Sequence, residues 1–136
     1  MASWGDLADY VRAEYDVIHD EDEELRILFT FGDDDEGDDE RTQVVIIVRE
    51  VLDKMHEWVQ IASPCGLAAD VNLRDVLEEV GKSTVACGLA IMGEHVVVRH
   101  SLPLVDLDIH EFTDPLQLLA GTADMLEETF WGGDGY

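Results

Sequence analysis

The segment Thr-Gln-Val-Val-Ile-Ile-Val-Arg-Glu-Val-Leu at 42–52 limits the possible folds of this chain more than any other stretch. Branched aliphatic residues favour strands, and successive side chains of a strand point to opposite faces. The even-numbered residues from Val44 to Val48 therefore share one face, while Val45 and Ile47 share the other. A sheet covered on one side needs only one apolar face. We therefore expect something to cover the second face: a helix of the same chain, a second copy or a bound segment.

Periodicity and turn residues predict the other elements. The predicted elements are a helix at 3–14, strands at 25–31, 42–52 and 57–63, a helix at 72–83, strands at 84–92 and 95–102, and a final helix that starts at Asp114-Pro115. Ser3 and Asn72 are the expected N-caps of the first two helices, and Ser-Pro-Cys-Gly at 63–66 is expected to end the third strand. Adjacent strands joined by short turns favour antiparallel pairing. The order α-β-β-β-α-β-β-α therefore predicts an α+β fold, an antiparallel sheet with flanking helices.

The length of 136 residues suits one domain, and we see no linker that would divide residues 1–136. Seven of the eight residues from Asp33 to Glu40 are acidic, so the segment 32–41 is interpreted as a solvated hairpin loop between two strands. Its spacing does not fit a calcium-binding EF-hand loop. The glycine-rich segment 131–136 is predicted to be a frayed C-terminus.

The net charge is −24, from 32 acidic and 8 basic residues. This charge repels nucleic acid and anionic membranes as direct ligands. Either the acidic surface is an adaptation to high salt, or it attracts a basic partner. No apolar run is long enough to span a bilayer, and the N-terminal residues do not resemble a signal peptide, so the expected location is the cytoplasm.

The sequence shows no local catalytic or metal-binding motif. Cys65 and Cys87 fit neither a zinc pattern nor a redox pair, so both are expected to be free and buried. The five histidines lack the spacings of metal ligands. These observations predict a protein that is not an enzyme and that uses no cofactor and no metal. An enzyme with a dispersed active site stays open as an alternative.

The order of elements resembles the type III secretion chaperone-like fold, whose members include the Tir-chaperone group and the YbjN-like proteins. The segment Gly-Glu-His-Val-Val-Val-Arg-His-Ser-Leu-Pro-Leu and the amphipathic helix that follows, together residues 93–130, carry the resemblance. It implies a homodimer that binds polypeptide segments, or regulates through such binding, without catalysis.

The doubly apolar strand and the final helix supply the expected interface with a partner. The candidate residues of the dimer or partner interface are Val45, Ile47, Trp58, Leu126 and Phe130. The predicted function is a dimeric, chaperone-like or regulatory protein that binds a polypeptide client. A second alternative is an acidic mimic that binds a basic protein, and this binding would weaken steeply as salt rises.

Overall fold

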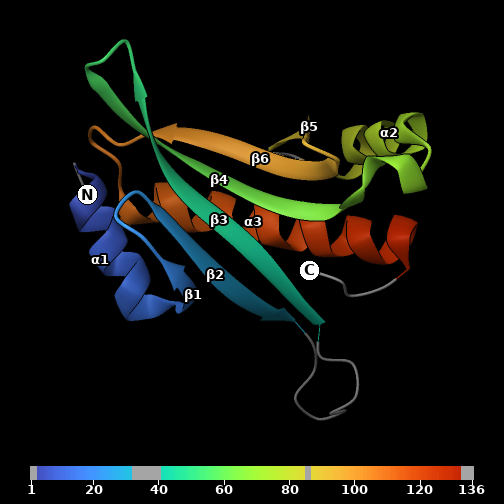
Figure 1. The fold of residues 1–136 in the computed structure, drawn as a ribbon, viewed down its shortest axis with the longest axis horizontal. Helices are drawn as coiled ribbons and strands as arrows, with labels where there is room; N and C mark the ends of the chain where they lie inside the picture. Colours follow the sequence, from blue (N-terminus) through green and yellow to red (C-terminus); the bar gives the residue numbers. More distant parts are fainter. Residues whose placement is uncertain (1–2, 32–40, 85–86, 133–136) are drawn as a thin grey trace.

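The computed structural model describes residues 3–31, 41–84 and 87–132. It confirms the α+β class: six strands form one antiparallel sheet in the order β1-β2-β3-β4-β6-β5. Figure 1 shows α3 lying across one face of this sheet, with α1 and α2 at opposite ends of the molecule. The predicted acidic loop 32–41, apart from Arg41, and residues 133–136 of the predicted frayed end lie outside the described residues.

The elements follow the chain in the order α-β-β-β-β-α-β-β-α. Their bounds are α1 Trp4–Glu14, β1 Asp16–Asp20, β2 Glu24–Phe31, β3 Arg41–Leu52, β4 His56–Leu67, α2 Leu73–Ser83, β5 Gly88–Met92, β6 His95–Pro103, α3 Ile109–Leu126 and a final π-helical turn at Glu127–Trp131. The predicted caps of the first two helices are confirmed, because the side chain of Ser3 accepts from the Asp6 amide and that of Asn72 from the Asp75 amide.

The sequence did not predict β1. This strand forms one edge of the sheet and pairs with β2, with Asp16 opposite Leu28 and Asp20 opposite Leu25. Its side chains alternate between exposed and half-buried, and Asp16 and Asp20 both face solvent. An edge strand can thus be held mainly by its backbone hydrogen bonds, without the apolar alternation that reveals a strand in the sequence.

The predicted end of the third strand at 63–66 is wrong, because β4 continues through Pro64 to Leu67. Proline cannot donate a hydrogen bond to a neighbouring strand, so it sits in a sheet mainly at edges and bulges. Here the register of β4 against β6 shifts between Pro64 and Gly66. This irregularity lets a central strand accommodate the proline.

The predicted start of the final helix at Asp114-Pro115 is also wrong. The helix α3 begins at Ile109, and Asp108 caps it in a capping box with Glu111. This reciprocal pair satisfies two backbone amides at the helix start, and Pro115 lies inside the helix. At the other end, Gly132 adopts a left-handed φ of 71° and terminates the final turn.

The core lies between the sheet and the helices α1 and α3. The odd-numbered residues of β2 and β3 supply its sheet side, for example Leu25, Ile27, Val45 and Ile47, all with no exposed surface. The helix side consists of Trp4, Leu7, Ala8 and Val11 of α1, Val76 of α2, and Phe112, Leu116, Leu119, Ala120, Ala123 and Leu126 of α3. One face of the sheet is therefore covered by the chain itself.

Candidate binding face of the sheet

The two faces of β3 have different surroundings. Val45 and Ile47 are completely buried under the helices, whereas Val44, Ile46 and Val48 on the other face are only half-buried. Val45 and Ile47 therefore form the apolar face of β3 that helices of the same chain cover. Within the described residues no helix packs on the second face, which we call the open face.

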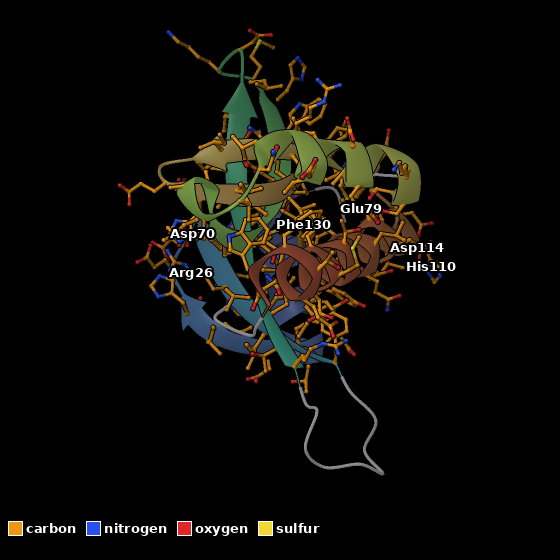
Figure 2. The ribbon with its side chains drawn as sticks, turned by 90° about the vertical axis from the view of Figure 1, so that its right-hand side faces the viewer. Arg26, Asp70, Glu79, His110, Asp114 and Phe130 are labelled. Atoms are coloured by element: carbon orange, nitrogen blue, oxygen red, sulfur yellow. The ribbon has the colours of Figure 1, made fainter. Side chains whose placement is uncertain are left out.

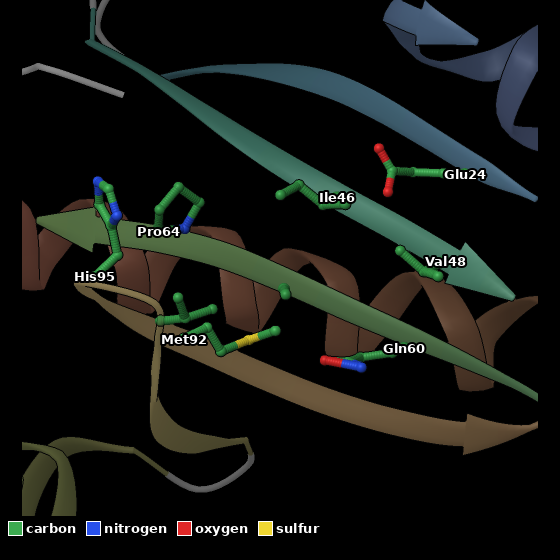
Figure 3. A pocket seen from close by; sticks show the side chains of 9 residues that line it. Glu24, Ile46, Val48, Gln60, Pro64, Met92 and His95 are labelled. Carbon is green, nitrogen blue, oxygen red and sulfur yellow. The ribbon is translucent and has the colours of Figure 1, made fainter. Parts of the chain in front are cut away.

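A shallow groove of about 510 Å³ runs over the open face. Figure 3 shows its side chains on the near side of the sheet and α3 behind it. The strands β2, β3 and β4 and the β5–β6 hairpin contribute to it. The floor is formed by Ile46, Val48, Ala62, Pro64 and Val97, and the rim by Glu24, Gln60, Met92 and His95. Hydrocarbon dominates the floor, so the groove is suited to apolar side chains.

The register of the strands explains why these residues meet. Ile46 of β3 lies opposite Ala62 of β4, and Pro64 lies opposite Val97 of β6. Outward-facing residues of neighbouring strands therefore form continuous apolar rows across the middle of the sheet. The sequence shows each row only as scattered single residues.

Charged side chains on the open face are few and nearly balanced. The outward-facing positions of the six strands carry Asp16, Glu24, Glu50, Arg26 and Arg99, which sum to −1, against −24 for the whole chain. The Arg26 Nε donates to a Glu24 carboxylate oxygen at 2.9 Å, and the Gln60 amide donates to the Glu50 carboxylate. The open face is therefore a nearly neutral area on a strongly acidic protein.

The predicted interface residues do not form one surface. Val45, Ile47 and Leu126 have no exposed surface and belong to the core. Trp58 is half-buried and faces outward near the start of β4. Phe130 packs against Trp131 in the helical turn that follows α3. Figure 2 shows Phe130 on the α3 side of the sheet, away from Arg26 on the open face.

The pattern of 42–52 indicated two apolar faces, but it could not tell which of them the helices would cover. The residues missed by sequence reasoning are therefore those of the groove floor. Their only sign in the sequence was the even-numbered series of β3, whereas the predicted interface named Val45 and Ile47 on the opposite face.

A group of possible cation ligands lies at the turn between β1 and β2. The Nε2 atom of His19 is 3.0 Å from a Glu21 oxygen and 3.9 Å from a Glu24 oxygen. All three side chains are at least partly exposed, and Glu24 also binds Arg26. We interpret this group as a surface ion-pair cluster, because the arginine competes for the carboxylate that a cation would need.

The two cysteines are free, as predicted, and only Cys65 is fully buried. Burial raises the pKa of the Cys65 thiol to about 12, and burial raises the pKa of the half-buried Cys87 thiol to about 11. Both thiols are therefore protonated at neutral pH. A protonated thiol is a poor nucleophile, so neither residue has the character of a catalytic cysteine.

A second apolar surface lies between α2 and β5. Leu73, Val76 and Leu77 of α2 face Leu89 and Ile91 of β5 across a small groove of about 190 Å³; Ala90 and Val96 complete its lining. Leu77 and Ile91 are 57% and 56% exposed. The described part of the chain leaves this surface partly uncovered.

No family model matches this chain, and no curated protein matches it. Within the described ranges, none of the helices combines the length and the apolar composition needed to cross a membrane.

Proposed function

We propose that this protein is a non-enzymatic, chaperone-like or regulatory protein that binds an extended polypeptide segment on its open sheet face. The observation that carries the proposal is the apolar groove over Ile46, Ala62 and Val97, on the face that α1 and α3 leave free. Ala62 and Val97 line the floor of this groove with only 6% of their surface exposed, and apolar grooves with a few polar side chains at the rim are a common form of binding site. The resemblance of residues 93–130 to YbjN-like proteins supports the same function.

The size and shape of the groove suit weak, reversible binding. A segment that buries three apolar side chains gains roughly 5–9 kcal/mol by removing them from water. Ordering and association cost several kcal/mol of this gain. We therefore expect dissociation constants in the micromolar range or weaker, as suits a protein that releases its client.

We also infer a homodimer, formed through β5. This strand is one edge of the sheet, and Gly88–Met92 contains no charged residue, whereas the opposite edge strand β1 carries Asp16 and Asp20. Uncharged edge strands pair readily with other strands. An antiparallel β5–β5 pair around a two-fold axis would also cover the exposed Ile91.

The composition and the free thiols support a proposal for the cellular setting. Two free cysteines suit a reducing compartment, so we infer a cytoplasmic location. The net charge of −24 suits a salt-rich interior, where ions screen the repulsion between carboxylates.

Binding of a labelled neutral nonapeptide with alternating leucine, valine and small polar residues tests the function. Fluorescence anisotropy should show saturable binding to the parent protein and none to Ile46→Asp. The control Leu118→Asp changes an exposed apolar residue of α3, outside the groove, and should bind like the parent.

Repeating the titration in molar potassium chloride separates apolar capture from acidic mimicry. Apolar capture should keep or gain affinity as salt rises, whereas a mimic of nucleic acid would bind basic peptides and lose them steeply. A parent protein that binds only a basic peptide, and only at low salt, would contradict the proposal.

A further inference from the structure

Arg99 borders the groove of the open face. It lies on β6 directly opposite Ala62, a floor residue, and two positions from Val97 on the same face. On its other side β5 places Gly88, where a Cβ atom would meet nothing within 4 Å. The half-buried side chain of Arg99 therefore has open space beside it and apolar neighbours across the sheet.

The pairing of the other arginines makes this position unusual. Every other arginine has a carboxylate partner, and the closest contacts are Arg12–Asp20 at 3.0 Å, Arg26–Glu24 at 2.9 Å, Arg41–Asp124 at 3.0 Å, Arg49–Glu57 at 2.9 Å and Arg74–Glu78 at 2.9 Å. Among the described residues, Arg99 alone of the six arginines forms no ion pair, although the chain has 32 acidic residues. The two lysines, Lys54 and Lys82, are exposed and lie off the strands of the sheet.

We propose that Arg99 recognises a carboxylate on the bound segment, so that the preferred ligand is an apolar peptide with an acidic residue beside its anchors. This inference rests on the proposed function and names the chemistry of its ligand. A guanidinium group can hold a carboxylate through two parallel hydrogen bonds, a geometry that no other side chain matches. The partial burial of Arg99 protects such a pair from solvent.

The net charge of −24 alone would favour a basic ligand. The inference predicts the opposite preference, for an acidic one. The open face itself is nearly neutral, so the unfavourable force on an acidic peptide acts from a distance. At an ionic strength of about 0.1 M, salt largely screens exposed charges that lie more than about 10 Å apart, but it weakens a partly buried contact much less. An acidic peptide should therefore bind better as salt rises.

Three peptides with the same apolar residues test the inference. The three peptides differ only at one polar position, which is Glu, Gln or Lys. Further sets of three place this variable residue at other positions along the peptide. In molar potassium chloride, we expect the best Glu peptide to bind the parent about tenfold more tightly than its Gln partner, the gain of one charged hydrogen-bonded pair. Arg99→Gln should remove this preference while the Gln peptide binds as before.

Lys82→Gln is the matched control, because it removes the same charge from an exposed site outside the groove and should keep the preference for Glu. If the Gln peptide binds and the Glu peptide is no tighter at any position, or if Arg99→Gln keeps the preference, the inference is wrong and the proposed function stands. If no peptide of the set binds the parent, both fail. A change of particle mass in Arg99→Gln, with no change in peptide preference, would assign Arg99 to contact with a second copy instead and overturn the inference.

Discussion

The indole ring of Trp131 lies directly over Gly66, and its Nε1 atom donates a 3.0 Å hydrogen bond to the carbonyl of Leu67. The contact is so close that a Cβ atom at position 66 would overlap the indole ring. It ties the last helical turn to the end of β4, across more than 60 positions of sequence.

Gly66→Ala should therefore displace Trp131 and lower the free energy of unfolding by about 1–3 kcal/mol, the usual cost of overpacking. Denaturant titration measures this loss. The control Gly121→Ala lies in α3, where a Cβ atom meets nothing within 4 Å, and should raise stability by about 0.4–1 kcal/mol. Equal effects of the two substitutions would show that the Trp131 contact is not tight.

Ile46 and Ile47 are neighbours on β3, but they face opposite sides of the sheet. Ile47→Asp places a charge in the core and should cost more than about 4 kcal/mol, enough to unfold much of the population. Ile46→Asp should cost about 1 kcal/mol or less and keep the fold, because its side chain reaches solvent. Circular dichroism and denaturant titration check both, and an Ile46→Asp chain that unfolds as Ile47→Asp does would mean that the open face is covered.

The Cys65 thiol should resist alkylation in the native protein at neutral pH and react at once in denaturant. Its pKa is raised by burial to about 12, well above the ordinary value of 9.0, so the native state holds the thiol proton more tightly than the unfolded state. This contribution to stability is complete below pH 9 and is lost as the pH rises toward 12. Stability measured across this range should fall more steeply in the parent than in Cys65→Ala, and parallel curves would contradict the shift.

The unfolding midpoint should rise clearly between dilute buffer and molar potassium chloride. With a net charge of −24, repulsion among carboxylates opposes the compact state until ions screen it. Thermal melts in a series of salt concentrations measure the effect. A flat or falling midpoint would remove adaptation to high salt as the account of this composition.

Ile91→Lys should convert the proposed dimer into a folded monomer. A lysine on an uncharged edge strand opposes pairing with a second copy, and the exposed Ile91 contributes little to the fold of one chain. Light scattering at several concentrations gives the mass, and Val51→Lys is the control at another exposed aliphatic residue, on β3. A parent protein that is monomeric at tens of micromolar concentration would disprove the dimer.

Much of the fold could be predicted from local sequence. The alternation at 25–31, the branched residues at 42–52 and the caps Ser3 and Asn72 each have a short-range physical cause, and the structure contains the corresponding elements. The antiparallel α+β class then followed from their order, because short connections leave little choice of pairing.

Tertiary structure decided the rest. The edge strand β1 depends on backbone pairing with β2, and Pro64 stays within β4 only because a bulge against β6 accommodates it. Alternation along β3 shows that Val45 and Val44 point in opposite directions, but it does not show which of the two faces is buried. Only the packing of α1 and α3, a long-range burial of apolar surface, made one face the core and left the other as the candidate binding site.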